Sequence, residues 1–389
     1  MENRCPACAS TSLCEVATVR DVPVHVGVLW RSAAEARACA TGTLAVASCG
    51  RCGLLTNTEF DPNLLDYGFD YDNSLHASAV FRDFESSLVS ELVERHDLHD
   101  KYIVEIGGGD GRFIGLLCEQ GGNRGICFDP SADPWCSPHP DVELVAEPFG
   151  PDSLPADVDF ICCRQVLEHI ADLHAFLEPV TAVLRARPGA SAYLEVPEST
   201  MMLRDLSIWD LVYEHCHYFV KESFSSLLES ADLEVLTTRT GFGDQFLSAE
   251  VSAAAEPQGV PRTSVEPLPI ELRRMIGSLG ANIETGRDEW VRRLGELRSE
   301  GRKVAVWGAG ARAVTFCAMV GGAGEVDYFV DANPAKQGTY LAGSGHPIHP
   351  PDHLVYEPVD VVVILNNIYE DEIRAGLTTM NVEAELVAG

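Results

Sequence analysis

The sequence predicts an α/β protein made of a small N-terminal zinc-binding domain, a central Rossmann-like domain and a smaller C-terminal α/β domain that is also Rossmann-like. Three observations support this prediction. Two Cys-x-x-Cys pairs lie in the first part of the chain, and two later segments, 103–111 and 303–313, each run from an apolar strand into a glycine-rich turn. At 389 residues, the chain is also longer than one hydrophobic core usually serves.

The N-terminal cysteine pairs predict a structural zinc site. Cys5 and Cys8 form the first pair, and Cys49 and Cys52 form the second. Four thiolates complete the tetrahedral coordination of Zn²⁺ and leave no open position for chemistry. Zinc ribbons usually separate their pairs by roughly fifteen to twenty residues. The longer loop here keeps open the alternative of two unrelated turns with reduced cysteines.

Composition excludes several classes of partner. With 28 basic and 59 acidic residues, the net charge is 28 − 59 = −31, which repels a nucleic-acid backbone. The 13 cysteines indicate a reducing compartment, so we expect a cytoplasmic protein. No apolar stretch reaches the length of a membrane span, and the first residues lack the pattern of a signal peptide. We therefore expect a small-molecule substrate, with neither nucleic acid nor membrane as partner.

Hydrophobic patterning divides the chain into four regions. We expect a zinc-binding domain and lid over 1–85, a Rossmann-like domain over 86–253, a linker and long helix over 254–300, and a C-terminal α/β domain over 301–389. A helical stripe runs over 81–95, and another over 272–297. Apolar strands alternate with helical patterns in the second region, which predicts a doubly wound parallel sheet. Its expected strands are 103–106, 125–128, 160–163, 192–196 and 233–239.

The first glycine turn has the pattern of S-adenosylmethionine (SAM) methyltransferases. Glu105 lies two residues before the first of three alternating glycines, Gly107, Gly109 and Gly111. The carboxylate suits the methionine ammonium and would repel a pyrophosphate. Asp129 ends the next strand, where an acid accepts hydrogen bonds from ribose hydroxyls. A turn that only packs helix on strand is the alternative. Further candidate cofactor residues are Glu147, Arg164 and Gln165.

The order of these parts resembles that of the sugar C-methyltransferases of antibiotic deoxysugar biosynthesis, and the resemblance covers nearly the whole chain. It implies a zinc-binding head, a SAM domain and a C-terminal domain that helps to hold a nucleotide-linked sugar. The reaction that it implies is methyl transfer to a ring carbon beside the ketone, usually of a dTDP-linked 4-keto sugar.

The family's active-site stretch reads Y-x-E-H-x-x-Y-F, and residues 212–219 read VYEHCHYF. Glu214, His215 and Tyr218 match in register, whereas the first tyrosine falls one position later, at Tyr213. Carbon methylation needs a base that removes a proton next to a carbonyl, and His215, oriented and made more basic by Glu214, suits this role. Tyr213 or His217 is expected to stabilise the enolate oxygen. Packing beside the sheet is the alternative role for this stretch.

Two residues that follow the zinc head are candidates for a lid over the substrate. Tyr71 and His76 lie in an aromatic and polar stretch, for which a plain packing role is equally compatible. Tyr218 is also expected to contact the substrate.

The second glycine turn carries Gly308, Gly310 and Arg312, and Asp331 ends the following strand. Read alone, this pattern indicates a dinucleotide site. The resemblance assigns it to the nucleotide half of the substrate, with the Arg312 charge close to the pyrophosphate. A turn with packing duties only remains the alternative. Further candidate substrate residues at the same edge are Lys336, Asn366 and Asn367.

The interpretation that we carry forward is SAM-dependent C-methylation of a nucleotide-linked keto-deoxysugar by a monomer or weak dimer. Three other functions remain open from the sequence. They are O- or N-methylation of a non-sugar secondary metabolite, an NAD(P)-dependent reaction at the second turn, and a zinc adaptor for another macromolecule.

Overall fold

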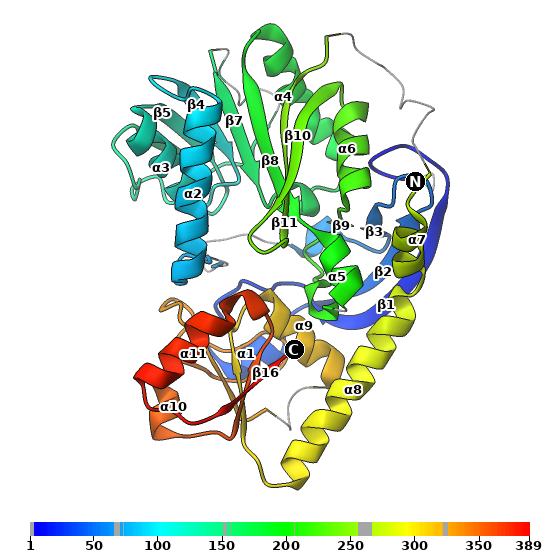
Figure 1. Cartoon of the computed structure of the whole chain (residues 1–389), viewed down its shortest axis with the longest axis vertical. Coiled ribbons are helices and arrows are strands. Elements are labelled where there is room, and N and C mark those ends of the chain that lie inside the picture. The colour runs from blue at the N-terminus through cyan, green and yellow to red at the C-terminus, as the bar shows by residue number, and fades with distance from the viewer. Residues whose placement is uncertain are drawn as a thin grey trace.

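The computed structural model of the chain is shown in Figure 1. It describes residues 4–65, 71–72, 74–150, 153, 155, 157–205, 207–255, 267–321 and 326–389. Within these residues the strands form three sheets, one antiparallel, one mixed and one parallel. The prediction of a mixed α/β protein with two Rossmann-like units is confirmed. Residues 256–266, which belong to the expected linker, lie outside the described residues.

The N-terminal sheet has the strand order β1-β2-β3-β9 and is antiparallel. Its strands are β1 (Leu13–Pro23), β2 (Thr41–Cys49), β3 (Leu55–Asn57) and β9 (His217–Tyr218). The short helix α1 (Ala33–Arg37) lies between β1 and β2, and the 3-10 helix η1 (Pro62–Leu64) follows β3. Strand β9 comes from the predicted active-site stretch, with Tyr218 opposite Leu55 and His217 opposite Thr56. The N-terminal sheet therefore holds one end of that stretch.

The central sheet has the order β10-β11-β8-β7-β4-β5-β6. Its strands are β4 (Tyr102–Ile106), β5 (Arg124–Phe128), β6 (Val142–Val145), β7 (Phe160–Arg164), β8 (Ser191–Pro197), β10 (Leu233–Gly241) and β11 (Phe246–Ala253). The helices of this part are α2 (Ala79–Arg95), α3 (Arg112–Gly121), α4 (Leu173–Ala186), α5 (Ser199–Asp205) and α6 (Lys221–Ser230). Two 3-10 helices, η2 (Leu167–His169) and η3 (Ile208–Asp210), complete it.

The expectation of a wholly parallel central sheet is wrong for its last two strands. Strands β4 to β8 are parallel, but β10 and β11 form an antiparallel hairpin that pairs with β8. The turn of the hairpin is tight because Phe242, Gly243 and Asp244 all adopt positive φ, between 49° and 62°. This turn brings residues 242–246 to the cavity described below.

The C-terminal sheet is parallel throughout and has the order β14-β13-β12-β15-β16. Its strands are β12 (Val304–Trp307), β13 (Tyr328–Val330), β14 (Ile348–His349), β15 (Val361–Ile364) and β16 (Glu385–Ala388). The helices α9 (Ala311–Val320), α10 (His353–Tyr356) and α11 (Glu370–Thr379) and the 3-10 helix η4 (Asn367–Tyr369) belong to the same part. The strand order reverses between β12 and β15, which is the position where such sheets bind ligands.

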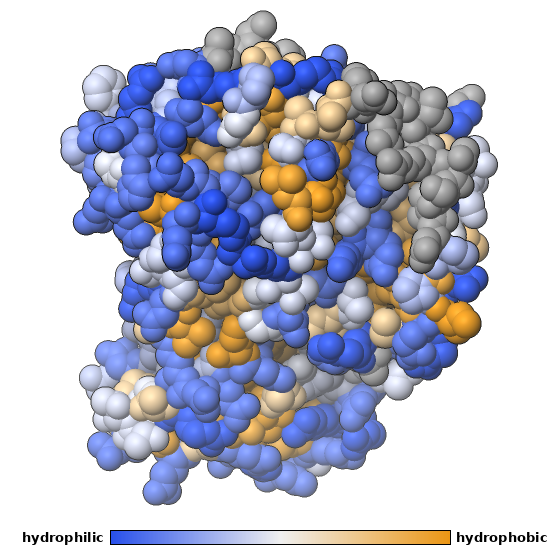
Figure 2. Space-filling model, turned by 45° about the horizontal axis from the view of Figure 1, so that its top comes forward, coloured by the Kyte–Doolittle hydropathy of each residue, from blue (hydrophilic) through white to orange (hydrophobic). Residues whose placement is uncertain are grey.

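Two helices connect the central and C-terminal parts and run along one side of the molecule in Figure 1. They are α7 (Ile270–Gly277) and α8 (Leu279–Ser299), where a single long helix was expected. Gly277 and Ser278, both weak helix formers, lie at the break. None of the helices in the described residues is long and apolar enough to cross a membrane. On the face shown in Figure 2, hydrophilic residues cover most of the surface.

The N-terminal part packs against both Rossmann-like units. Leu44 of β2 shares one apolar core with Trp290 of α8 and Phe316 of α9, whereas the four predicted zinc ligands lie in the core that contains Val104 and Leu194 of the central sheet. The N-terminal residues thus contribute to the packing of both halves of the molecule.

Candidate active site

One large cavity lies between the central and C-terminal sheets. Its volume is about 1380 Å³, and residues of both glycine turns line it. The residues that follow β4, β5 and β7 meet it from one side, and those that follow β12, β13 and β15 meet it from the other. Ligands of parallel α/β sheets bind at the carboxyl ends of the strands. The topology therefore directs two ligand-binding edges into the same space.

The first glycine turn lines the cavity through residues 107–110. Gly107 has a φ of 72°, and a Cβ there would come within 2.2 Å of Val166 Cγ2, so the position requires glycine. Asp129 also lines the cavity, and its Oδ2 accepts a hydrogen bond from the Gly109 N–H at 2.8 Å. Gly111 caps α3 with a φ of 71° and does not line the cavity. Glycine is required here because a Cβ on residue 111 would lie 2.5 Å from Leu144 Cδ2.

The predicted cofactor residues Glu105 and Arg164 both line the cavity; Glu105 is buried, and the Arg164 side chain is 10% exposed. Burial raises the pKa of Glu105 to about 8, which the Arg164 charge partly opposes. The Arg164 guanidinium donates to Glu85 Oε1 and to Glu195 Oε1, both at 3.1 Å, and lies 4.0 Å above the Phe113 ring centroid. These contacts hold Arg164 rigidly beside the first glycine turn.

The other two predicted cofactor residues differ in their placement. Gln165 lines the cavity with a left-handed backbone, at a φ of 56°, and its amide donates to Glu195 Oε1. Glu147 is exposed and lies outside the cavity, whereas the adjacent Pro148 and Phe149 line it. The proximity of Glu147 to the adenine stays a prediction, since only its neighbours Pro148 and Phe149 are among the residues that line the cavity.

His215 lines the cavity. The His169 ring lies edge-on to it with 4.9 Å between centroids, and the Tyr218 ring is 6.0 Å away. Burial, together with His169, holds the pKa of His215 well below its usual range. The imidazole is therefore neutral at neutral pH and able to accept a proton.

Glu168 lies beside these histidines in the cavity and was not singled out as a catalytic residue. It is 1% exposed, and among the described residues its Oε2 finds no hydrogen-bond partner. Burial raises the pKa of Glu168 to about 8. One ligand atom from each of Glu168, His169 and His215 lies within 4.8 Å of the others, so the cluster has the composition of a metal site.

Glu214 does not orient the His215 ring as expected. Its Oε1 accepts from the Val26 N–H at 2.7 Å, its Oε2 accepts from the Tyr71 hydroxyl at 2.6 Å, and the side chain lies outside the cavity. Burial raises the pKa of Glu214 to about 7. Glu214 therefore supports Tyr71, which itself lines the cavity.

Tyr213 and His217 also lie outside the cavity. The Tyr213 side chain is buried, and its hydroxyl accepts a hydrogen bond from the Asp61 N–H at 3.1 Å. The His217 Nδ1 lies 3.0 Å from Thr56 Oγ1 within the pairing of β9 with β3. Both side chains are held by the N-terminal sheet, which the sequence did not reveal, so the expectation that either reaches the enolate is wrong.

His76 lines the cavity beside Tyr71. Both of its ring nitrogens have partners, Glu85 Oε2 at 2.8 Å and Ser74 Oγ at 3.0 Å. Tyr218 reaches the cavity as predicted, and its hydroxyl donates to the Val212 carbonyl at 2.8 Å. The predicted lid residues therefore meet at one wall, but His76 is occupied by intramolecular contacts.

The second glycine turn has a hydrogen-bond pattern similar to that of the first. The Gly308 N–H donates to the Val330 carbonyl at 2.8 Å, as the Gly107 N–H does to Phe128. Asp331 Oδ2 accepts from the Ala309 N–H at 2.7 Å, one residue after Gly308, whereas Asp129 accepts from Gly109, two residues after Gly107. Gly308, Gly310 and Asp331 all line the cavity. The correspondence favours a nucleotide-type turn over one with packing duties alone.

The polar residues around the second turn differ in whether other side chains already engage them. Lys336 lines the cavity, is 6% exposed, and forms no ion pair among the described residues. The Arg312 guanidinium is paired with both oxygens of Asp210. Asn366 lines the cavity and exchanges two hydrogen bonds with Gln245. Asn367 is exposed and outside the cavity, because η4 begins there and turns its side chain away.

Sequence reasoning missed the cavity residues that come from unexpected elements. Phe242, Gln245 and Phe246 reach the cavity from the β10–β11 hairpin, and Glu372 reaches it from α11. The hairpin could have been recognised from the turn sequence Phe242-Gly243-Asp244 between two alternating segments. For Glu372 the sequence offers no such signal.

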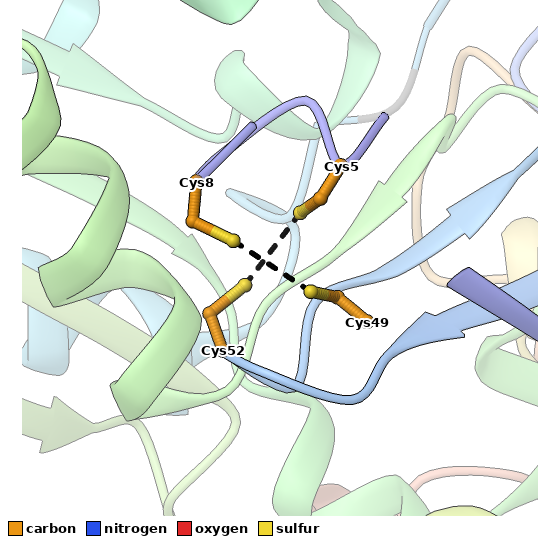
Figure 3. Close-up of side chains that lie close together, drawn as sticks. All are labelled: Cys5, Cys8, Cys49 and Cys52. Atoms are coloured by element: carbon orange, nitrogen blue, oxygen red, sulfur yellow. Dashed lines mark hydrogen bonds between the residues drawn. The ribbon is translucent and has the colours of Figure 1, made fainter. Parts of the chain in front are cut away.

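The four N-terminal cysteines converge as predicted, and Figure 3 shows their sulfur atoms pointing toward one another. Cys5 Sγ lies 3.6 Å from Cys52 Sγ, and Cys8 Sγ lies 3.6 Å from Cys49 Sγ. A tetrahedral zinc with Zn–S bonds of about 2.3 Å separates its sulfurs by about 3.8 Å. All four residues are buried, so the donor set and its geometry fit a closed structural zinc site.

Two protein families match the chain. Residues 77–238 match a methyltransferase domain, and residues 273–387 match a C-methyltransferase C-terminal domain. Among curated proteins, the C-methyltransferase NovU of Streptomyces niveus is 26% identical over 361 residues, which cover 85% of this chain and 81% of that protein. The similarity to NovU thus extends well beyond a single domain.

Solved structures are similar to part of the chain. The 1,6-didemethyltoxoflavin-N1-methyltransferase of Burkholderia thailandensis, with bound S-adenosylhomocysteine, is 19% identical with a TM-score of 0.36, and the match covers 45% of this chain and 81% of that one. The magnesium protoporphyrin IX methyltransferase of Synechocystis PCC 6803, also with bound S-adenosylhomocysteine, is 16% identical with a TM-score of 0.36 and coverages of 48% and 91%.

Proposed function

We propose that the chain, an S-adenosylmethionine-dependent methyltransferase, is a C-methyltransferase that methylates a ring carbon beside the ketone of a nucleotide-linked keto sugar. The observation that carries this proposal is the single cavity that joins two nucleotide-type glycine turns, with His215 on its wall. One turn would serve the cofactor, and the other would serve the nucleotide of the substrate. A dTDP-linked 4-keto-deoxysugar is the substrate that we propose first.

The first glycine turn is the proposed SAM site. Residues 107–110 bring the backbone close to the ligand, and Asp129 lies at the position that accepts hydrogen bonds from a ribose. Glu105 lies beneath the turn and is held near Arg164. When bound, SAM supplies an electrophilic methyl group. The chain's contribution is to orient that group toward the wall that carries His215.

The second glycine turn is the proposed site of the substrate's nucleotide. The N-terminus of α9, at Gly310, favours a negatively charged group such as a pyrophosphate. The Lys336 ammonium is close to this turn, 3.5 Å from where a Cβ on Gly310 would lie. We propose that Lys336 contributes the positive charge at this site, since Arg312 is already paired with Asp210.

His215 is the proposed general base. Its neutral imidazole takes the proton from the carbon next to the ketone, and the electron pair of that C–H bond forms the enolate. The enolate carbon would then take the methyl group, whose bond to the cofactor sulfur breaks with its electron pair left on that sulfur. Glu168 lies beside His215 and its pKa is raised to about 8, so a protonated carboxyl is available to donate a hydrogen bond to the enolate oxygen. Tyr71, held by Glu214, provides a second hydroxyl at this wall.

The proposal is tested with methyl-labelled SAM and a panel of dTDP-4-keto-deoxysugars in deuterated water. We expect label on a ring carbon and deuterium exchange at that carbon, both lost in His215→Asn. His99→Asn, an exposed histidine outside the cavity, is the matched control and should retain both. Methylation of an oxygen or nitrogen would favour the non-sugar alternative, and transfer to no keto sugar would refute the substrate assignment.

A further inference from the structure

We infer that Arg312 is a positioning residue that acts through Asp210 and fixes the segment carrying His215 against the second glycine turn. The inference rests on the proposed role of His215. Arg312 follows Gly310 of the turn by two residues, and Asp210 precedes His215 by five. A single ion pair therefore connects the proposed nucleotide site with the proposed base.

The contacts of the Arg312 guanidinium leave little capacity for a ligand. Its Nε donates to Asp210 Oδ1, and its Nη2 donates to Asp210 Oδ2 at 3.0 Å, which is the two-point geometry that favours arginine over lysine. Two further acceptors contact Nη1 and Nη2. Nη1 reaches the Leu365 carbonyl at 3.2 Å, and Nη2 reaches Gln245 Oε1 at 3.3 Å. Arg312 thus joins the central part, the hairpin turn and the end of β15.

The segment around Asp210 is packed firmly enough to transmit its position. Trp209 is buried with its ring centroid 4.8 Å from that of Phe316 in α9, and Thr315 of the same helix donates to the Leu211 carbonyl at 3.3 Å. The Tyr218 hydroxyl then holds the Val212 carbonyl. Because residues 209–212 are fixed on both sides, displacement of Asp210 would displace the adjoining residues that lead to His215.

A second contact supports the same interface. The side-chain amides of Gln245 and Asn366 exchange two hydrogen bonds, each 2.9 Å long, between the hairpin turn and the end of β15. Gln245 contacts Arg312 as well, so the three side chains form one network across the cavity. The network spans the two sheets where their ligand-binding edges meet.

Electrostatics argues against phosphate binding by Arg312. A phosphate that took the guanidinium away would leave the Asp210 carboxylate unpaired in the same cavity, where it would repel the phosphate. Lys336 and the N-terminus of α9 provide an anion site without this cost. We therefore assign anion binding to Lys336 and positioning to Arg312.

The test compares Arg312→Gln, Asp210→Asn and their double variant with the wild-type protein. Hydrogen–deuterium exchange of 211–218 is measured without ligands, and calorimetry gives the affinities for thymidine diphosphate and S-adenosylhomocysteine. Arg302→Gln is the matched control, because Arg302 pairs with Glu385 within the C-terminal part at 2.6 Å. Arg312→Lys keeps the positive charge but loses the planar guanidinium that donates to both Asp210 oxygens. This variant tests for partial rescue of kcat.

We expect faster exchange at 211–218 in both single variants and no further increase in the double variant. Affinity for each of the two ligands should stay within about threefold of wild type, while kcat for an accepted keto sugar falls by at least about tenfold with a smaller change in KM. Arg312→Lys should recover part of kcat. The control should match wild type in every measurement.

A different pattern would overturn the inference. If Arg312→Gln weakens thymidine diphosphate binding by about tenfold, while Asp210→Asn does not and exchange at 211–218 is unchanged, Arg312 is a phosphate ligand. If no keto sugar is a substrate, the proposed function fails, but the exchange measurement still decides the positioning role. The same holds if thymidine diphosphate fails to bind the wild-type protein.

Discussion

At the scale of single residues, burial sets the chemistry of the cavity wall. His215 is neutral because burial and the nearby His169 disfavour its charged form, and Glu168 is protonated near neutral pH because its carboxylate would be desolvated. A neutral base beside a protonated acid is the pair of protonation states that enolate formation requires. In the structure, burial accounts for these protonation states, and the Glu214–His215 contact that the sequence suggested does not.

Tyr71 gives the first prediction. Tyr71 lines the cavity and its hydroxyl donates to Glu214, so Tyr71→Phe removes a hydroxyl from a residue of the cavity wall and raises the pKa of Glu214 above about 7. A hydrogen bond to a charged group contributes about 1.5–3 kcal/mol, so we expect kcat to fall about tenfold or more. Steady-state kinetics with calorimetry of S-adenosylhomocysteine binding measures this.

The control for Tyr71→Phe is Tyr102→Phe, since the Tyr102 ring lies outside the cavity under Arg124. It should leave kcat unchanged. An unchanged kcat in Tyr71→Phe itself would exclude the hydroxyl from the reaction and leave Tyr71 with a packing role.

Sequence analysis located cavity residues where their position depends on local sequence. Gly107, Gly109, Glu105 and Asp129 line the cavity, and they were singled out because a strand, a turn and a helix follow one another within about twenty residues. Tyr213 and His217 were misplaced because their surroundings come from β3 and residues near 60, far away in the sequence. Long-range pairing of this kind has no signature in a short motif.

At the scale of elements, a helix of the C-terminal part caps a helix of the central part. Glu372 of α11 accepts hydrogen bonds from the Ser78 hydroxyl at 2.6 Å and from the Ala79 N–H at 2.8 Å, at the start of α2. A carboxylate at this position satisfies a free backbone donor and complements the helix dipole. The orientation of α2 is therefore tied to α11 across the cavity.

This contact gives the second prediction. Glu372→Ala should lower the free energy of unfolding by about 1–2 kcal/mol, since it removes both hydrogen bonds and a favourable dipole interaction. Glu370→Ala is the control, because Glu370 forms an i,i+4 pair with Arg374 in the same helix, which contributes only about 0.5 kcal/mol. Urea unfolding measures both. Equal losses in the two variants would show that the cap contributes no more than the surface pair.

The elements themselves were predicted to different degrees. The parallel strands at 103–106, 125–128 and 160–163 were found nearly in full because each is a short and mostly apolar segment. The antiparallel N-terminal sheet was not found. Its β9 strand has two residues, His217 and Tyr218, and its partner β3 has three, too few for an alternating pattern.

At the scale of the whole molecule, the cysteine cluster joins the N-terminal part to the central core. Cys5, Cys8, Cys49 and Cys52 belong to the same apolar cluster as Val104 of β4. Loss of a metal there would disturb the packing of the central sheet as well as the turns that carry the cysteines. The cluster is therefore expected to affect global stability, although it lies apart from the cavity.

Metal analysis gives the third prediction. We expect one zinc per chain by mass spectrometry, lost in Cys49→Ser together with a decrease in melting temperature of about ten degrees or more. Cys14→Ser is the control, because Cys14 is an exposed cysteine in the same part of the chain, and it should keep the metal. Full zinc occupancy in Cys49→Ser would contradict the four-cysteine site.

The fourth prediction concerns the pH dependence of stability, to which buried carboxyls and buried histidines contribute with opposite signs. Burial raises the pKa of Glu105 and Glu168 to about 8, so the folded state keeps these protons after the unfolded chain has released them near pH 4. Stability from these groups therefore falls as the pH rises toward 8. Burial lowers the pKa of His96, His169 and His217 to about 4, so their effect is the reverse and is confined below about pH 6.5.

Between about pH 4.5 and 6.5 the three histidines outweigh the two carboxyls, so the stability from these five groups rises with pH, whereas above about pH 6.5 the carboxyls act alone. We expect the free energy of unfolding of the ligand-free protein to fall between about pH 6.5 and 8, by up to about 1.4 kcal/mol per pH unit for each carboxyl still protonated. Urea unfolding across this range measures the slope. Glu105→Gln should reduce it, whereas Glu119→Gln, at an exposed position of α3, should not. Stability that rises with pH over this interval would mean that the cavity carboxyls are ionised in the folded protein, and that Glu168 reaches the reaction without a proton to donate.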